Sequence, residues 1–85
     1  MKGNCIIPVR NENLDMLFGE DFMIDTKGLS CRIKVSGGSV GVSLKEGAFA
    51  RFPVLDGEDF DFCGKLYCHI TSGTPTVHCM YYTTL

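Results

Sequence analysis

Apolar and polar residues alternate along most of this chain, over residues 21–83, between short glycine-containing turns. Successive side chains of a strand point to opposite faces, so a period of two predicts strands with one buried face. The stretch from Cys31 to Val35 shows the pattern clearly, because Arg32 and Lys34 separate its three apolar residues. The chain is therefore expected to be all-β and almost entirely antiparallel.

Four turn sequences predict hairpins, and each turn fixes which residues face each other across two strands. Gly37-Gly38 suits a two-residue primed turn, which needs positive φ at its central positions, and it pairs Val35 with Val40. The other expected turns are residues 25–28, residues 45–47 with Gly47 left-handed, and residues 72–75. These turns pair Ile24 with Leu29, Val42 with Ala50, Val40 with Phe52, Cys68 with Cys79, and His69 with His78.

The first nineteen residues are expected to form an arm and a turn. Pro8 has no backbone donor, so a strand at residues 4–9 belongs at a sheet edge. Further on, Asn13 can cap a helix, apolar residues follow at helical spacing, and Gly19 can end it. This pattern predicts a short helical turn near residues 12–18.

The length of 85 residues and a hydrophobic fraction of 45% describe one folded domain, residues 1–85, with a thin core. Six or seven short strands with turns every eight to twelve residues predict a small antiparallel β-sandwich or open barrel. The expected parts are the arm and turn 1–19, a β-meander 20–55, an acidic loop 56–63 and a C-terminal hairpin 64–83.

Charge and hydropathy argue against two classes of partner. The net charge is −2 and no basic run occurs, so a nucleic acid is not expected. No stretch approaches the ~18 apolar residues of a membrane span, and the first residues lack the apolar core of a signal peptide. We therefore expect no membrane partner and synthesis in a cytoplasm.

Five cysteines form an odd set, which favours reduced and buried thiols in a chain without a signal peptide. Cys68-His69 and His78-Cys79 read like zinc ligands along the sequence. Adjacent residues of a strand point to opposite faces, however, so each dipeptide divides its two ligands across the sheet. Thiols are preferred, and a Cys68–Cys79 disulfide and a metal site stay open as alternatives.

The two histidines are expected to face each other across the last hairpin. If both become protonated below a pKa of about 6.5, they repel, and an interface that contains them loosens in acid. The alternative is that His69 and His78 are two solvated surface side chains.

Four carboxylates within six residues mark an exposed loop, and their oxygens could hold Ca²⁺. Their spacing differs from that of the twelve-residue EF-hand loop, so a solvated loop is preferred. The four residues are Asp56, Glu58, Asp59 and Asp61.

Catalytic patterns are missing from the sequence. The histidines are predicted on the face opposite their neighbouring cysteines, and no Gly-x-Ser-x-Gly elbow occurs. The chain is therefore not expected to be an enzyme or to hold a cofactor.

Aromatic residues gather in the last third of the chain, and so thin a core is not expected to bury them all. Some should face a partner, together with the apolar start of the chain and the two histidines. The candidate interface residues are Ile6, Ile7, Phe60, Phe62, Tyr67, His69, His78, Tyr81 and Tyr82.

Residues 33–82 resemble the small β domains of tailed-bacteriophage virion proteins, such as head decoration, head-fibre and tail-associated subunits. The resemblance lies in residues 39–44 with their glycine turn, Phe52-Pro53, and residues 65–67 leading through Gly73 to residues 77–82. It implies a structural role in many copies on a capsid or tail surface, with no catalytic residues.

The leading hypothesis is therefore a non-enzymatic virion component that binds other virion proteins, such as the major capsid subunit, and copies of itself. Its affinity would come from apolar burial and from strand addition at an edge. The alternative is a cytoplasmic carbohydrate- or peptide-binding β module. A metal or redox protein built on the cysteines is a third class.

Overall fold

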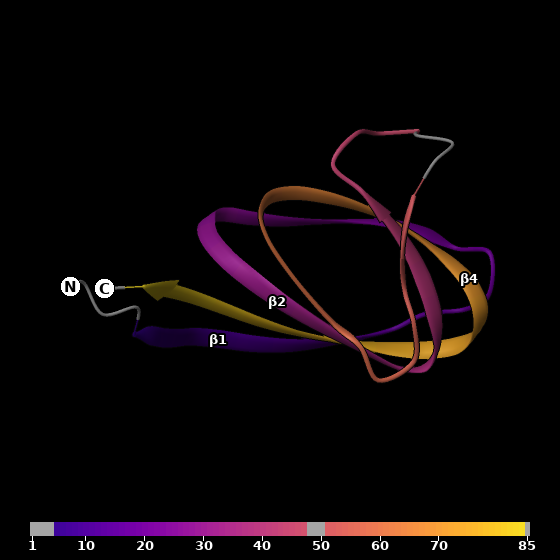
Figure 1. Cartoon of the computed structure of the whole chain (residues 1–85), viewed down its shortest axis with the longest axis horizontal. Coiled ribbons are helices and arrows are strands. Elements are labelled where there is room, and N and C mark those ends of the chain that lie inside the picture. The colour runs from indigo at the N-terminus through magenta and orange to yellow at the C-terminus, as the bar shows by residue number, and fades with distance from the viewer. Residues whose placement is uncertain (1–4, 48–50, 85) are drawn as a thin grey trace.

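The computed structural model describes residues 5–47 and 51–84, and these residues form four strands and no helix (Figure 1). All pairings are antiparallel, and the strand order in the sheet is β1-β4-β2-β3. The all-β, antiparallel prediction is confirmed. The strands are β1 (Ile6–Asp15), β2 (Asp21–Ser43), β3 (Phe52–Val54) and β4 (Asp59–Thr84).

Two long strands replace most of the six or seven short strands that the turns predict. β2 has 23 residues and β4 has 26. Residues 30–34 of β2 pair with residues 59–63 of β4 on one side and with residues 78–82 of β4 on the other. A strand can have the same partner on both sides only if the two strands wind around each other, as Figure 1 shows.

The winding produces two four-stranded faces. The β1 face consists of β1, residues 30–36 of β2, and residues 59–63 and 76–84 of β4. The β3 face consists of β3, residues 21–25 and 38–43 of β2, and residues 65–72 of β4. Their inward side chains share one core, which includes Ile33, Val35 and Val77 from the β1 face and Val40, Leu66 and Ile70 from the β3 face.

Gly37-Gly38 is a corner in β2 and not a hairpin turn. Val35 pairs with Val77, and Val40 pairs with Ile70 and Val54, so the predicted Val35–Val40 pair is wrong. Only Gly37 of the two glycines has positive φ, which excludes a type I′ hairpin turn, and the pairing of the flanking residues excludes any hairpin turn at this place. The chain therefore bends into the second face and does not reverse.

The other two turns within β2 and β4 are corners as well. Ile24 pairs with Leu66 and not with Leu29, because β2 continues through Lys27 and Gly28, which have φ of 51° and 90°. β4 likewise continues through residues 72–75, so the predicted pairs across that turn are wrong. The observed partners are Phe22 and Val42 for Cys68, Glu12 and Ile33 for Cys79, Asp21 and Gly41 for His69, and Asn13 and Lys34 for His78.

One hairpin of the prediction exists, although with a different register. β2 and β3 pair Val42 with Phe52 and Val40 with Val54, so the predicted Val40–Phe52 and Val42–Ala50 pairs are wrong. The connection is two residues longer than these pairs required. Gly47 has φ of 71°, which confirms its left-handed conformation. Residue Ala50 itself lies outside the described residues.

The predicted helical turn at residues 12–18 is wrong, because β1 continues to Asp15. The following segment bonds to β4, with the Met16 N–H donating to Pro75 O at 3.0 Å and the Gly19 N–H to Ile70 O at 3.1 Å. These backbone bonds between distant residues take the place of local helical ones. The edge position predicted from Pro8 is confirmed, since β1 ends the sheet and its register shifts between Pro8 and Arg10.

Candidate binding surfaces

The structure divides the candidate interface residues among separate places. Ile6 and Ile7 are exposed on β1, and His78 is exposed on the outside of the β1 face. Phe60, Tyr67 and His69 are half-buried. Phe62, Tyr81 and Tyr82 are buried, and Phe62 and Tyr81 belong to the core, so little of their rings is left for a partner.

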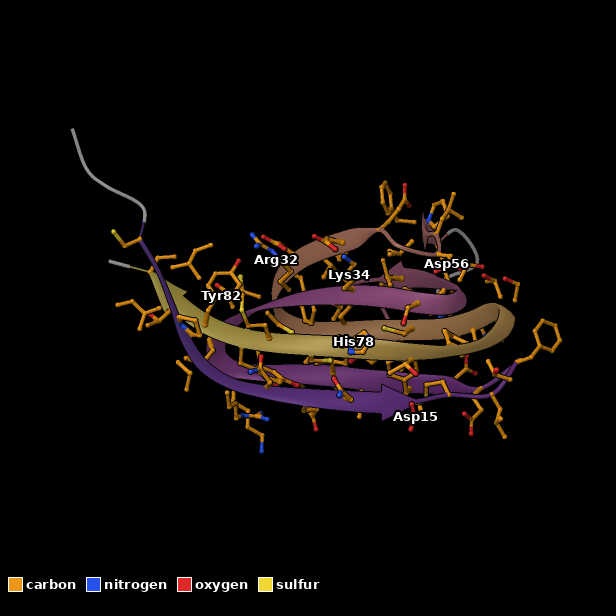
Figure 2. All side chains as sticks on the ribbon, turned by 90° about the horizontal axis from the view of Figure 1, so that it is seen from below. Asp15, Arg32, Lys34, Asp56, His78 and Tyr82 are labelled. Carbon is orange, nitrogen blue, oxygen red and sulfur yellow. The ribbon has the colours of Figure 1, made fainter. Side chains whose placement is uncertain are left out.

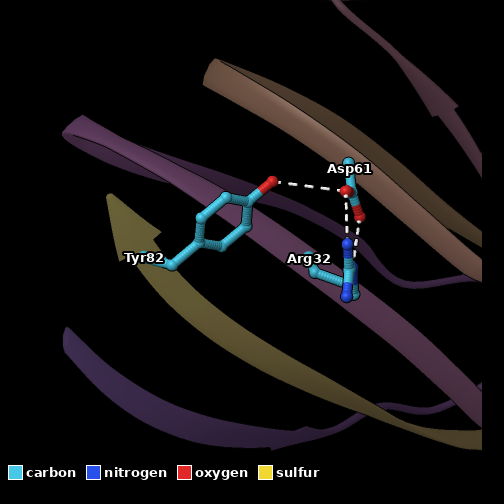
Figure 3. A network of polar contacts seen from close by, with 3 residues as sticks. All are labelled: Arg32, Asp61 and Tyr82. Carbon is cyan, nitrogen blue, oxygen red and sulfur yellow. Dashed lines mark hydrogen bonds and ion pairs between the residues drawn. The ribbon is translucent and has the colours of Figure 1, made fainter. Parts of the chain in front are cut away.

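Tyr82 lies outside the core cluster, beside an ion pair on the surface. Arg32 holds Asp61 with two bonds, Nε to Oδ1 at 2.8 Å and Nη2 to Oδ2 at 3.0 Å, and the Tyr82 hydroxyl donates to Oδ2 at 3.2 Å (Figure 3). The hydrogen bonds from Arg32 lower the pKa of Asp61. Burial and the nearby Asp61 carboxylate raise the pKa of Tyr82. The network ties together the two β4 segments that lie on either side of β2.

Tyr81 makes a similar connection to β1. Its hydroxyl donates to Glu12 Oε1 at 2.8 Å, and the guanidinium carbon of Arg10 lies 3.8 Å from its ring centroid. Burial and the bond to Glu12 raise the pKa of Tyr81. Its role is therefore to fasten the edge strand to the core.

His78 lies at the centre of the outer side of the β1 face, on the yellow part of β4 between β1 and Lys34 of β2 (Figure 2). Its Nδ1 is 2.9 Å from Asn13 Oδ1, and its Nε2 is 3.2 Å from Ser36 Oγ. A shallow hollow of about 350 Å³ surrounds it. The hollow is lined by Asn11, Asn13, Arg32, Lys34, Asp59, His78, Cys79 and Met80.

The hydrogen bonds of His78 form a chain from Ser36 through His78 to Asn13. Hydrolases contain a similar chain of a nucleophile, a base and a group that orients the base. Such chemistry also needs donors for the oxyanion in a site that excludes water. The Gly37 N–H, next to Ser36, already donates to Asp56 Oδ1 at 3.2 Å, and His78 is open to solvent. The three residues therefore form a polar surface cluster without the features of an active site.

His69 lies on the outer side of the other face, the β3 face, where Nδ1 is 2.6 Å from Asp21 Oδ1. The prediction that His69 and His78 face each other is wrong. His69 pairs with Asp21 and Gly41 on the β3 face, whereas His78 pairs with Asn13 and Lys34 on the β1 face. Their mutual repulsion therefore gives no acid-sensitive interface.

All five cysteines are free thiols; Cys31, Cys68 and Cys79 are buried as expected, whereas Cys5 and Cys63 are exposed. Burial raises the pKa of Cys68 to about 12. A hydrogen bond with Cys31 and burial raise the pKa of Cys79. No group of three or more His, Cys, Asp or Glu side chains is placed to hold a metal in the part of the chain that the structure describes.

The acidic loop is exposed, as predicted, although β4 already begins at Asp59. Some of its carboxylates hold the loop itself: Glu58 Oε1 accepts the Leu55 N–H at 2.9 Å, and Asp56 Oδ1 accepts the Gly37 N–H. Asp61 is bound to Arg32.

An apolar groove beside this loop contains residues that the sequence interpretation missed. The rings of Phe52 and Phe60 lie 5.6 Å apart and those of Phe60 and Phe62 6.4 Å apart, so they connect the surface to the core. The groove has a volume of about 580 Å³. Its lining consists of Phe52, Pro53, Leu55, Gly57, Glu58 and Asp59. The predicted and observed registers differ by two positions, so both place Phe52 on the same face as the buried valines Val40 and Val42. Phe52 starts the short edge strand β3 and remains 62% exposed, which the alternation of side chains did not indicate.

Comparison with known proteins supports the fold alone. No protein-family model and no curated protein matches this chain. The chain is similar to a solved structure described as a de novo designed double-stranded β-helix, with 20% sequence identity and a TM-score of 0.58. The match covers 87% of this chain and 99% of the designed one. No helix among the described residues is long and apolar enough to cross a membrane.

Proposed function

We propose that this chain is a non-enzymatic assembly module whose copies associate through the free edge of β1. The observation that carries the proposal is the apolar start of this edge strand. Ile6, Ile7 and Val9 are all exposed on this edge strand, Val9 by 53%, and Val9 lies at the register shift between Pro8 and Arg10. The virion setting, implied only by the resemblance, stays a prediction.

The free edge of β1 has the groups that strand addition needs. Among the described residues β1 pairs on one side only, with the end of β4, so its other side presents unpaired N–H and C=O groups. A second chain can bond to these groups and cover aliphatic side chains, which supplies both direction and apolar burial. A small sandwich is the architecture that we propose for this module, and the core that the two faces share supports it.

Charge favours one register between two copies. An antiparallel pair of β1 strands centred on Asn11 places Arg10 of each copy opposite Glu12 of the other. This register also places Ile6 opposite Met16 and Val9 opposite Asn13, so the backbone bonds and the charge pairs contribute beside a limited apolar burial. Such an interface is isologous, so each residue contact occurs twice, and Asn11 faces its own copy at the axis.

The proposal is tested by light scattering over a range of protein concentrations. Wild type should form dimers, and Asn11→Asp should shift them to monomers, since it places two carboxylates opposite each other. Asn11→Gln adds no charge, and Thr74→Asp adds the same charge at an exposed corner; both should remain dimeric. A wild-type monomer at every concentration, or equal effects of Asn11→Asp and Thr74→Asp, would refute the proposal.

A second function is favoured by the hollow around His78, whose polar side chains fit the alternative of a small carbohydrate-binding module. Sugars bind such surfaces through several hydrogen bonds to side chains. Calorimetric titration with neutral oligosaccharides tests it, with His78→Ala as the variant and His69→Ala as the control on the other face. Saturable binding that only His78→Ala removes would favour this function over assembly.

A further inference from the structure

From the groove beside the acidic loop, we infer a second protein-binding surface that takes a basic peptide segment with an aromatic or aliphatic anchor. The inference is independent of the β1 edge, because the groove lies between β3 and the start of β4. Its occupant is an extended segment with one apolar residue between lysine or arginine residues.

The apolar part of the surface is a row of aromatic rings that remains open at its outer end. Phe62 is buried, Phe60 is half-buried and Phe52 is 62% exposed. Pro53 and Leu55 extend the apolar lining beside Phe52. A side chain that packs in the groove would cover the exposed ring face, which water otherwise contacts, and this burial supplies affinity.

The rim of the groove determines the charge of the partner. Glu58 and Asp59 belong to the lining, and Asp56 lies beside them in the same turn. Glu58 uses Oε1 to accept the Leu55 N–H, and Asp56 uses Oδ1 to accept the Gly37 N–H. An ionised carboxylate can accept up to about four hydrogen bonds, so these bonds to neutral N–H groups do not saturate it. The negative charge at the rim selects for cationic side chains and against acidic ones.

The loop is fixed before any partner arrives. The Gly57 N–H donates to Val35 O at 2.7 Å, and the Val35 N–H donates to Glu58 O at 3.2 Å. The Glu58 N–H also donates to Leu55 O at 2.9 Å. A loop held in this way loses little conformational freedom on binding, so more of the interaction energy appears as affinity.

The test is fluorescence anisotropy of three labelled nonapeptides. Each has Phe, Leu or Trp at its centre, flanked on both sides by Lys and Arg within a Gly-Ser background. At least one should bind with a Kd below 1 mM, and its Kd should rise at least fivefold between 50 and 500 mM NaCl. The same peptides with Glu in place of Lys and Arg should not bind.

Variants locate the surface. Phe52→Ala should weaken binding about tenfold or more, whereas Phe18→Ala removes a phenylalanine that is 69% exposed outside the groove lining and should change nothing. Glu58→Gln keeps an oxygen for the Leu55 N–H but removes the charge, so it should weaken binding and reduce the salt dependence. Circular dichroism verifies that each variant is folded.

Several results would overturn the inference. The first is that no cationic peptide binds saturably below 1 mM, and the second is that the acidic peptides bind equally well. The third is that Phe52→Ala and Phe18→Ala weaken peptide binding equally. A loss of the wild-type dimer in Phe52→Ala would also overturn it, because a second copy would then occupy the groove. Failure here leaves the β1 proposal intact, since Asn11→Asp does not alter the groove.

Discussion

Replacing Gly73 by alanine should destabilise the protein far more than the same change at another left-handed glycine. Gly73 lies where the corners of β2 and β4 meet, opposite Gly38. A Cβ there would lie 2.5 Å from Gly37 O and 3.1 Å from Gly38 Cα. Neither atom belongs to a flexible side chain, so the two backbones must separate by about 0.9 Å to reach ordinary van der Waals contact.

Two costs add at this position. The φ of Gly73 is 69°, and a residue with a Cβ pays about 1–2 kcal/mol for this conformation. Forcing packed backbones apart adds about 1–3 kcal/mol. The total is about 2–5 kcal/mol, against a free energy of unfolding of about 4–13 kcal/mol for a chain of this length.

Gly57→Ala is the matched control, because Gly57 has φ of 84° and no atom within 4 Å of its Cβ position. It should cost only the conformational part, about 1–2 kcal/mol. Urea unfolding with a common m-value measures both variants. If Gly73→Ala and Gly57→Ala differ by less than about 0.5 kcal/mol, within the error of such comparisons, the close approach of the two corners does not exist as described.

Three further predictions follow from buried polar groups. Thr26→Val should cost about 1–3 kcal/mol, because it leaves the Gly64 N–H without the Oγ1 acceptor at 2.8 Å, whereas Thr26→Ser should nearly preserve stability in urea unfolding. The pKa of Tyr81 is raised in the folded state, so its contribution is complete below about pH 10 and is lost above it. Wild type should therefore lose more stability between pH 9 and 11 than Tyr81→Phe, and equal slopes would contradict this. In the native protein a thiol reagent should react rapidly only with the exposed Cys5 and Cys63. The buried Cys31, Cys68 and Cys79 should react only after unfolding.

The sequence predicted which side chains point inward better than it predicted their partners. Ile33 and Val35 before the corner, and Val40 and Val42 after it, are all buried as the alternation required. The inward side chains have odd residue numbers before Gly37-Gly38 and even numbers after it. A hairpin turn and a corner at this place would both produce this change. Apolar alternation therefore cannot distinguish a chain that reverses from one that bends.

What the local pattern lacked was the distance in sequence between paired strands. The hairpin interpretation gives residues 30–34 two near neighbours, around residues 22–24 and 40–44, whereas the structure pairs them with two distant segments of β4. Both arrangements pair the backbone groups on the two sides of this strand, so backbone hydrogen bonding alone does not distinguish them. The spacing of the left-handed glycines was an available signal, since Gly19, Gly28, Gly37, Gly47 and Gly57 recur every nine or ten residues.

The candidate surfaces were harder to predict because they depend on this pairing. Tyr81 and Tyr82 were assigned to an interface on composition, but both are buried with their hydroxyls bonded to Glu12 and Asp61. A phenol can enter a core when its hydroxyl reaches a partner at the surface. Phe52, in contrast, keeps its face after a register change of two positions, but it starts the short edge strand β3 and is 62% exposed.

The wound topology limits where this protein can bind by its backbone or its apolar side chains. Both long strands are paired on two sides over much of their length, so the free edges of the described residues are β1, residues 21–25, β3 and residues 59–63. Between β3 and residues 59–63, the ring pair of Phe52 and Phe60 leaves an apolar groove. The edge of β1, in contrast, presents aliphatic residues with its outer backbone groups unpaired among the described residues. We therefore propose strand addition for β1 and insertion of an apolar side chain for the groove, and under these two proposals one copy would join two different partners.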